Sequence, residues 1–142
     1  MKKQTILLVD DDPDYLESNR AVLEAEGFDV HTAETAEQAL KLARSLSPAV
    51  AILDVIMDEP DSGFKLARQI RGSRETRNMR IVLLTALNDV NREKGIAYRF
   101  SDGDRDERWL PVDRILSKPV RPSMLAGVVH ELLGGHDEKS GR

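Results

Sequence analysis

The stretch Ala51-Ile52-Leu53-Asp54 decides the fold of this chain, because it joins a short apolar run to a single carboxylate. In three other stretches a short run of this kind is also followed by a polar side chain. They are residues 6–9 before Asp10, residues 81–84 before Thr85, and residues 115–117 before Lys118. Continuous apolar runs of this length are typical of parallel strands that are covered on both faces. Each run therefore predicts a buried strand with a reactive side chain at its carboxyl end.

Helical patterns separate these strands. Gly27 is expected to end the first helix, and Thr35 with Gln38 has the sequence of a capping box at the start of the second. Strands that alternate with helices indicate βαβ units and a parallel sheet, so the fold class is α/β. The expected helices begin at 13, 35, 64 and 122, a short strand covers 28–32, the central strand covers 49–53, and a fourth helix is expected within 90–100.

The bulk properties of the chain fit one globular domain. It has 142 residues, which is a usual length for a single domain, and we place that domain at 4–134 with a disordered polar tail at 135–142. The absence of cysteine excludes disulfides and thiol catalysis. A net charge of -4 argues against direct nucleic-acid binding. No apolar run approaches the roughly 20 residues of a spanning helix, and no secretory signal is evident, so we expect no membrane insertion and a cytoplasmic location.

The polar groups that follow the strands are expected to meet at one edge of the sheet. In an open parallel sheet, ligands bind beyond the carboxyl ends of the strands, where the strand order reverses. Asp10, Asp11 and Asp54 would therefore lie close together, and their mutual repulsion calls for a cation. Carboxylate oxygens with room for water suit Mg²⁺, so these three aspartates are the predicted metal ligands.

Asp54 is the predicted phosphate acceptor. A carboxylate is ionised at pH 7 and needs no general base to attack phosphorus, but it does need positioning and compensation of the phosphoryl charge. Lys118 can supply a point charge, and the Thr85 hydroxyl with the Ala86 amide can donate hydrogen bonds to a phosphoryl oxygen. Each group alone also has a structural explanation, such as a helix cap for an aspartate. Their occurrence at four strand ends favours the chemical interpretation.

At these positions the chain resembles the receiver domains of two-component response regulators. The matching segments are Val9-Asp10-Asp11-Asp12-Pro13, Leu53-Asp54, Leu84-Thr85-Ala86 and Ser117-Lys118-Pro119-Val120. The resemblance covers about residues 4 to 134 and implies a flavodoxin-like (βα)5 fold, a doubly wound parallel sheet of five strands in the order 2-1-3-4-5.

The resemblance also implies a role for each site residue. Asp54 would accept a phosphoryl group from a sensor histidine kinase or a histidine phosphotransfer protein. Asp11 and Asp54 would ligate Mg²⁺ directly, Asp10 mainly through water, and Ile56 through its backbone carbonyl. Thr85 would move toward the phosphoryl group and report its presence, and Lys118 would pair with it.

The chain departs from the family pattern in the loop after Asp54 and in the segment before the last strand. The loop is one residue longer and more acidic, so Asp58 or Glu59 could join the metal site, although a solvated loop is the simpler interpretation. Ile56 replaces a polar residue, which could slow attack by water. Ile115 stands at the usual aromatic switch position. The segment from Thr85 to Lys118 is about ten residues longer than usual, and the role of residues 88–111 within it is left open.

The leading hypothesis is a stand-alone phospho-acceptor switch rather than an enzyme. It would act by docking on an unknown downstream protein, by passing its phosphoryl group onward, or by forming a homodimer. A degenerate receiver that serves only as a scaffold is one alternative. A Mg²⁺-dependent phosphohydrolase of the haloacid-dehalogenase type is another, but Asp14 occupies a position where that pattern requires Thr or Val, and the chain lacks a cap domain.

Overall fold

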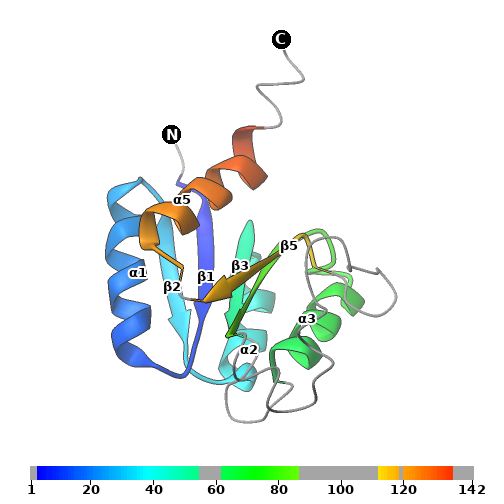
Figure 1. Cartoon of the computed structure of the whole chain (residues 1–142). Helices are drawn as coiled ribbons and strands as arrows, with labels where there is room; N and C mark the ends of the chain where they lie inside the picture. Colours follow the sequence, from blue (N-terminus) through cyan, green and yellow to red (C-terminus); the bar gives the residue numbers. More distant parts are fainter. Residues whose placement is uncertain (1–2, 55–61, 87–111, 119, 136–142) are drawn as a thin grey trace.

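Five parallel strands form one sheet at the centre of the molecule (Figure 1). In the computed structural model the described residues are 3–54, 62–86, 112–118 and 120–135. The strand order is β2-β1-β3-β4-β5, which confirms the predicted α/β fold and its strand order. The strands are β1 (Thr5–Val9), β2 (Asp29–Ala33), β3 (Val50–Asp54), β4 (Arg80–Ala86) and β5 (Arg114–Lys118).

Four α-helices and one π-helical turn are described around this sheet. They are α1 (Pro13–Ala25), α2 (Ala36–Leu46), α3 (Ser62–Gly72), α5 (Pro122–His130) and the π-helical turn η3 (Glu131–Gly135). The last helix thus loses α-helical geometry after His130 and continues as the π-helical turn to Gly135. The helix expected within 90–100 lies outside the described residues.

The helices cover both faces of the sheet, so each strand must be apolar on both sides. Figure 1 shows α1 and α5 on one side and α2 and α3 on the other. Alternate residues of β1 separate accordingly: Leu7 packs in the cluster that contains α2 and α3, whereas Ile6 and Leu8 pack in the cluster with α1 and α5. This double burial explains why the strands are continuous apolar runs in the sequence.

The strand ends differ from the expected ends by one or two residues, because pairing extends past the apolar runs. β3 continues to Asp54, which pairs in register with Leu84 of β4. β5 continues to Lys118, which pairs with Ala86. Asp54, Thr85 and Lys118 are therefore held by the sheet ladder and do not begin loops, whereas β1 ends at Val9, before Asp10.

The second helix is capped in a way that the sequence indicates only in part. The Thr35 hydroxyl accepts a hydrogen bond from the Gln38 N–H at 3.1 Å, as a capping residue should. The Gln38 side-chain oxygen, however, accepts from the Glu34 N–H at 3.0 Å, not from Thr35 as in a capping box. The glutamine reaches one residue further back, so it satisfies a donor outside the helix.

An ionic junction fixes the amino ends of β4 and β5. The Arg71 guanidinium, at the end of α3, donates to the Met79 carbonyl at 2.8 Å and to Asp113 Oδ2 at 3.2 Å. Asp113 Oδ2 also accepts the backbone N–H of Ile81 at 2.8 Å. The carboxylate of Asp113, the residue that precedes β5, is thus bonded to both α3 and β4.

Asp12 is the N-cap residue of α1, and the contribution of this cap to stability can be tested by substitution. Its Oδ1 accepts the backbone N–H groups of Asp14 at 3.0 Å and Tyr15 at 3.4 Å. Asp12→Ala is expected to lower the free energy of unfolding by about 1 kcal/mol in a urea titration, because two helical donors lose their acceptor. Asp12→Asn keeps an acceptor and should lose less than half of that amount. Equal losses in the two variants would contradict the capping role.

None of the helices within the described ranges is long and apolar enough to cross a membrane.

Candidate functional site

Asp10 and Asp54 lie side by side at the carboxyl edge of the sheet. Val9 pairs in register with Leu53, so the next residue on each strand falls at the same level. Both aspartates are buried, with 1% of Asp10 and 7% of Asp54 exposed. The backbone holds Asp10 firmly, because its N–H donates to the Ala33 carbonyl at 3.1 Å and its Oδ1 accepts the Asp12 N–H at 3.0 Å.

Asp11 completes a cluster of three carboxylates. One oxygen each from Asp10, Asp11 and Asp54 can be chosen so that all lie within 4.8 Å of one another. Asp11 is exposed, whereas the other two are buried, so the cluster opens to solvent on one side. Hard oxygen donors with access to water are the ligands that Mg²⁺ prefers. The three predicted metal ligands are thus brought together, and their chemistry fits this ion.

Lys118 provides the positive charge of the site. Its Nζ lies 3.1 Å from Asp10 Oδ2 and 3.3 Å from Asp54 Oδ1. Burial lowers the pKa of the Lys118 ammonium, but the carboxylates of Asp54 and Asp10 raise it more, so the net shift is upward. Lys118 therefore stays charged and is the counter-ion of two buried carboxylates.

The surroundings of Asp54 disfavour the ionised form of its carboxyl group. Burial and the neighbouring Asp10 charge raise its pKa, the Lys118 ammonium lowers it, and the net result is a pKa of about 6. At pH 7 most Asp54 side chains are still ionised, so the group is a nucleophile whose negative charge is incompletely compensated. An added cation would relieve that imbalance.

Sequence reasoning missed two residues beside the site, Tyr15 and Asn19. In the sequence Tyr15 is one of several apolar residues at helical spacing in the first helix, yet its ring faces Lys118, whose Nζ is 4.8 Å from the ring centroid. Asn19 was not singled out, although it is 1% exposed and donates from Nδ2 to the Tyr15 carbonyl at 2.8 Å. The position of Tyr15 in the first turn of α1, directly after the acidic run, places it near the site but does not indicate a contact with Lys118.

Of the other predicted site residues, Thr85 and Ala86 lie among the described residues. Thr85 is 6% exposed and lies at the carboxyl end of β4, one residue beyond the Leu84 that pairs with Asp54. Ala86 follows it and pairs with Lys118. Ile56, Asp58 and Glu59 lie outside the described residues, so the expected backbone ligand and the two loop carboxylates stay predictions.

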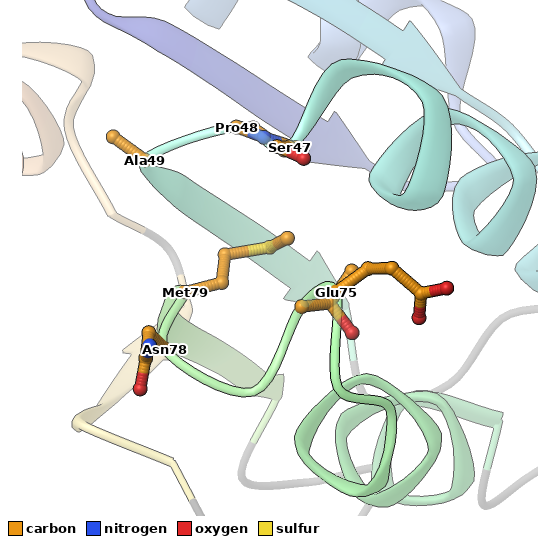
Figure 2. A pocket seen from close by; sticks show the side chains of 7 residues that line it. Ser47, Pro48, Ala49, Glu75, Asn78 and Met79 are labelled. Atoms are coloured by element: carbon orange, nitrogen blue, oxygen red, sulfur yellow. The ribbon is translucent and has the colours of Figure 1, made fainter.

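A hollow of about 210 Å³ lies at the opposite edge of the sheet (Figure 2). It is lined by the end of α2 and by the turn before β4, including Ser47, Glu75 and Met79. Ser47 has a left-handed backbone (φ 47°) and ends α2. The hollow is separated from the three carboxylates by the length of the strands, so it does not contribute to their chemistry.

Comparison with known proteins agrees with this geometry. The family model of the response regulator receiver domain matches residues 6–102. The chain belongs to the response regulator receiver family. Receiver domains are signalling switches, bind Mg²⁺ at an acidic cluster, and interact with histidine kinases and downstream proteins.

Two curated relatives and one solved receiver domain illustrate the similarity. Response regulator Rre1 of Synechocystis is 32% identical over 138 residues, which cover 96% of this chain and 54% of Rre1. The chain thus spans about half the length of Rre1. Protein PilH of Pseudomonas aeruginosa is 31% identical over 130 residues, covering 92% of this chain and 98% of PilH. The signal receiver domain of a histidine kinase from Syntrophus aciditrophicus is 29% identical with a TM-score of 0.70, covering 93% of this chain and 91% of that one.

Proposed function

We propose that this receiver is a Mg²⁺-dependent phospho-acceptor switch with Asp54 as the acceptor. The observation that carries the proposal is the arrangement around Asp54: two further carboxylates within 4.8 Å and the Lys118 ammonium at 3.3 Å. A purely structural role such as a helix cap would require neither two neighbouring carboxylates nor a lysine that is only 23% exposed. The domain is assigned to residues 4–134, and its proposed location is the cytoplasm.

The proposed reaction is transfer of a phosphoryl group from a phosphohistidine to Asp54. An Asp54 carboxylate oxygen attacks phosphorus, the new P–O bond forms as the P–N bond breaks, and the imidazole leaves with that electron pair. Because Asp54 is mostly ionised at pH 7, no residue has to remove a proton from it. The partner that carries the phosphohistidine would be a sensor histidine kinase or a histidine phosphotransfer protein.

The residues of this chain would stabilise the transferred group from several sides. Lys118 can turn from Asp54 to a phosphoryl oxygen, since it keeps Asp10 as a second partner. The Thr85 hydroxyl and the Ala86 N–H are the proposed donors to another oxygen. A Mg²⁺ ion held by Asp10, Asp11, Asp54 and the Ile56 carbonyl would supply further positive charge for the phosphoryl oxygens. The modified site would then change affinity for a downstream protein or for a second copy of the chain.

A direct test is to follow the intact mass of the protein with acetyl phosphate. We expect a Mg²⁺-dependent, acid-labile gain of one phosphoryl group in the wild-type protein, and no gain in Asp54→Asn. Asp14→Asn is the matched control, because Asp14 is exposed and contributes to no carboxylate cluster among the described residues; it should be modified like the wild type.

The outcomes separate the proposed switch from its alternatives. Modification that persists in Asp54→Asn would contradict the assignment of the acceptor. Mg²⁺ binding without any phosphoryl gain would favour a receiver used as a scaffold. Rapid turnover of a small phosphate ester would favour a phosphohydrolase.

A further inference from the structure

The Lys118 ammonium contacts the aromatic ring of Tyr15 in addition to the carboxylates of Asp10 and Asp54. Nζ lies 4.8 Å from the ring centroid, while Asp10 Oδ2 and Asp54 Oδ1 lie 3.1 Å and 3.3 Å away. A cation within about 6 Å of an aromatic face is attracted by the negative face of the ring, more strongly where water is partly excluded. Only 23% of the Lys118 side chain is exposed, so water is partly excluded here.

Hydrogen bonds of its backbone and packing of its ring hold Tyr15 in place. Its N–H donates to the Asp12 cap at 3.4 Å, and its carbonyl accepts from Asn19 Nδ2 at 2.8 Å. Its ring packs against the apolar cluster that α1 and α5 form on the sheet. The ring therefore has a fixed place in the first turn of a helix, from which it can restrain a long and flexible lysine.

The ring, rather than the hydroxyl, accounts for tyrosine at this position. The Tyr15 hydroxyl is buried, and the hydrogen-bonding group that acts on it is the Asn19 side chain of the same helix, not Lys118. The hydroxyl therefore does not explain the contact with Lys118. Phenylalanine should therefore reproduce the contact, whereas leucine would fill similar space without an aromatic face.

We infer that Tyr15 is a positioning residue, whose ring holds the Lys118 ammonium between Asp10 and Asp54. Lys118 occupies the same carboxylates that a divalent cation needs, so the strength of its restraint controls how readily they are released to that cation. The same restraint sets how well Lys118 is aligned with a phosphoryl group on Asp54. The second consequence rests on the proposed function, whereas the first does not.

The first test measures Mg²⁺ affinity by calorimetry on the metal-free protein. Tyr15→Leu is expected to bind Mg²⁺ about three-fold more tightly than the wild type, because Lys118 competes less well for the carboxylates. Tyr15→Phe should restore the wild-type affinity to within about 1.5-fold. Leu16→Val is the matched control, since Leu16 is buried on the next position of α1 and faces the core. Thermal unfolding establishes that each variant is folded.

A double-mutant cycle separates positioning from a merely structural effect. In a Lys118→Met background, Tyr15→Leu should change Mg²⁺ affinity by less than about 1.5-fold, because the group through which Tyr15 acts is gone. The Lys118 ε-methylene NMR signals should also shift in Tyr15→Leu and return toward the wild-type position in Tyr15→Phe. Equal tightening with and without Lys118, or equal behaviour of the Leu and Phe variants, would overturn the inference.

The second test measures the rate of modification by acetyl phosphate. Tyr15→Leu should slow the reaction about three- to five-fold, and Tyr15→Phe should restore it. If the wild-type protein takes no phosphoryl group, the proposed function fails, while the Mg²⁺ cycle still decides the role of Tyr15. If the wild-type protein is modified but the cycle shows no coupling, the inference alone fails.

Discussion

Asp54→Asn is expected to raise the free energy of unfolding of the metal-free protein by about 2 kcal/mol at pH 7. The pKa of about 6, compared with 3.8 for an unburied aspartate, means that ionised Asp54 costs the folded state about 3 kcal/mol. Asparagine has nearly the same shape and no charge, so it removes most of this cost. Lys118 still has Asp10 as a partner in the variant.

The gain in the free energy of unfolding of Asp54→Asn should depend on pH. The folded state binds the Asp54 proton more tightly than the unfolded state, so this group stabilises the fold less as the pH rises through about 6. The advantage of Asp54→Asn should therefore be complete above that pH and should disappear as the pH falls below 3.8, where both states are protonated. Urea titrations at several pH values measure it. Asp14→Asn, at an exposed position of α1 that contributes to no carboxylate cluster among the described residues, is the matched control. A gain that is independent of pH would contradict the electrostatic explanation.

Lys118→Met is expected to have the opposite effect and to lower the free energy of unfolding by about 2 to 3 kcal/mol at pH 7. Methionine is uncharged and only one heavy atom shorter than lysine, so it leaves Asp10 and Asp54 facing each other without a cation. Removing one partner of a buried ion pair costs about 3 to 5 kcal/mol, and the partial exposure of Lys118 reduces this amount. Loss of the ammonium should also raise the Asp54 pKa further.

Saturating Mg²⁺ is expected to restore most of the stability of Lys118→Met, because the ion replaces the missing charge and binds only the folded state. Phosphorylation should nevertheless fall by about 100-fold, because one of the groups that face the phosphoryl oxygens has gone. Lys41→Met, at an exposed position of α2, is the control and should change stability by less than about 0.5 kcal/mol. A variant as stable as the wild type without Mg²⁺ would show that Lys118 does not balance the carboxylates.

The sequence was sufficient to predict what depends on local pattern. Runs such as residues 6–9 and 81–84 predicted strands buried on both faces, and the parallel sheet then placed Asp10, Asp54 and Lys118 at one edge. Interactions that depend on side-chain packing were not predictable. Gln38 could reach either Thr35 or Glu34, and an apolar stripe gives no indication that one of its members, Tyr15, faces a lysine far along the chain.

Asp10 and Lys118 are separated by 108 residues in the sequence, and this separation has a consequence for assembly. A chain that has formed β1 and β3 but not yet added β5 brings two buried carboxylates together with no ammonium between them. Addition of the last strand supplies that charge, so electrostatic attraction favours this slow, long-range step. High salt should then retard the end of refolding more than its beginning. On the proposed function, a chain that stops before that step would present Asp54 without its lysine and would accept a phosphoryl group poorly.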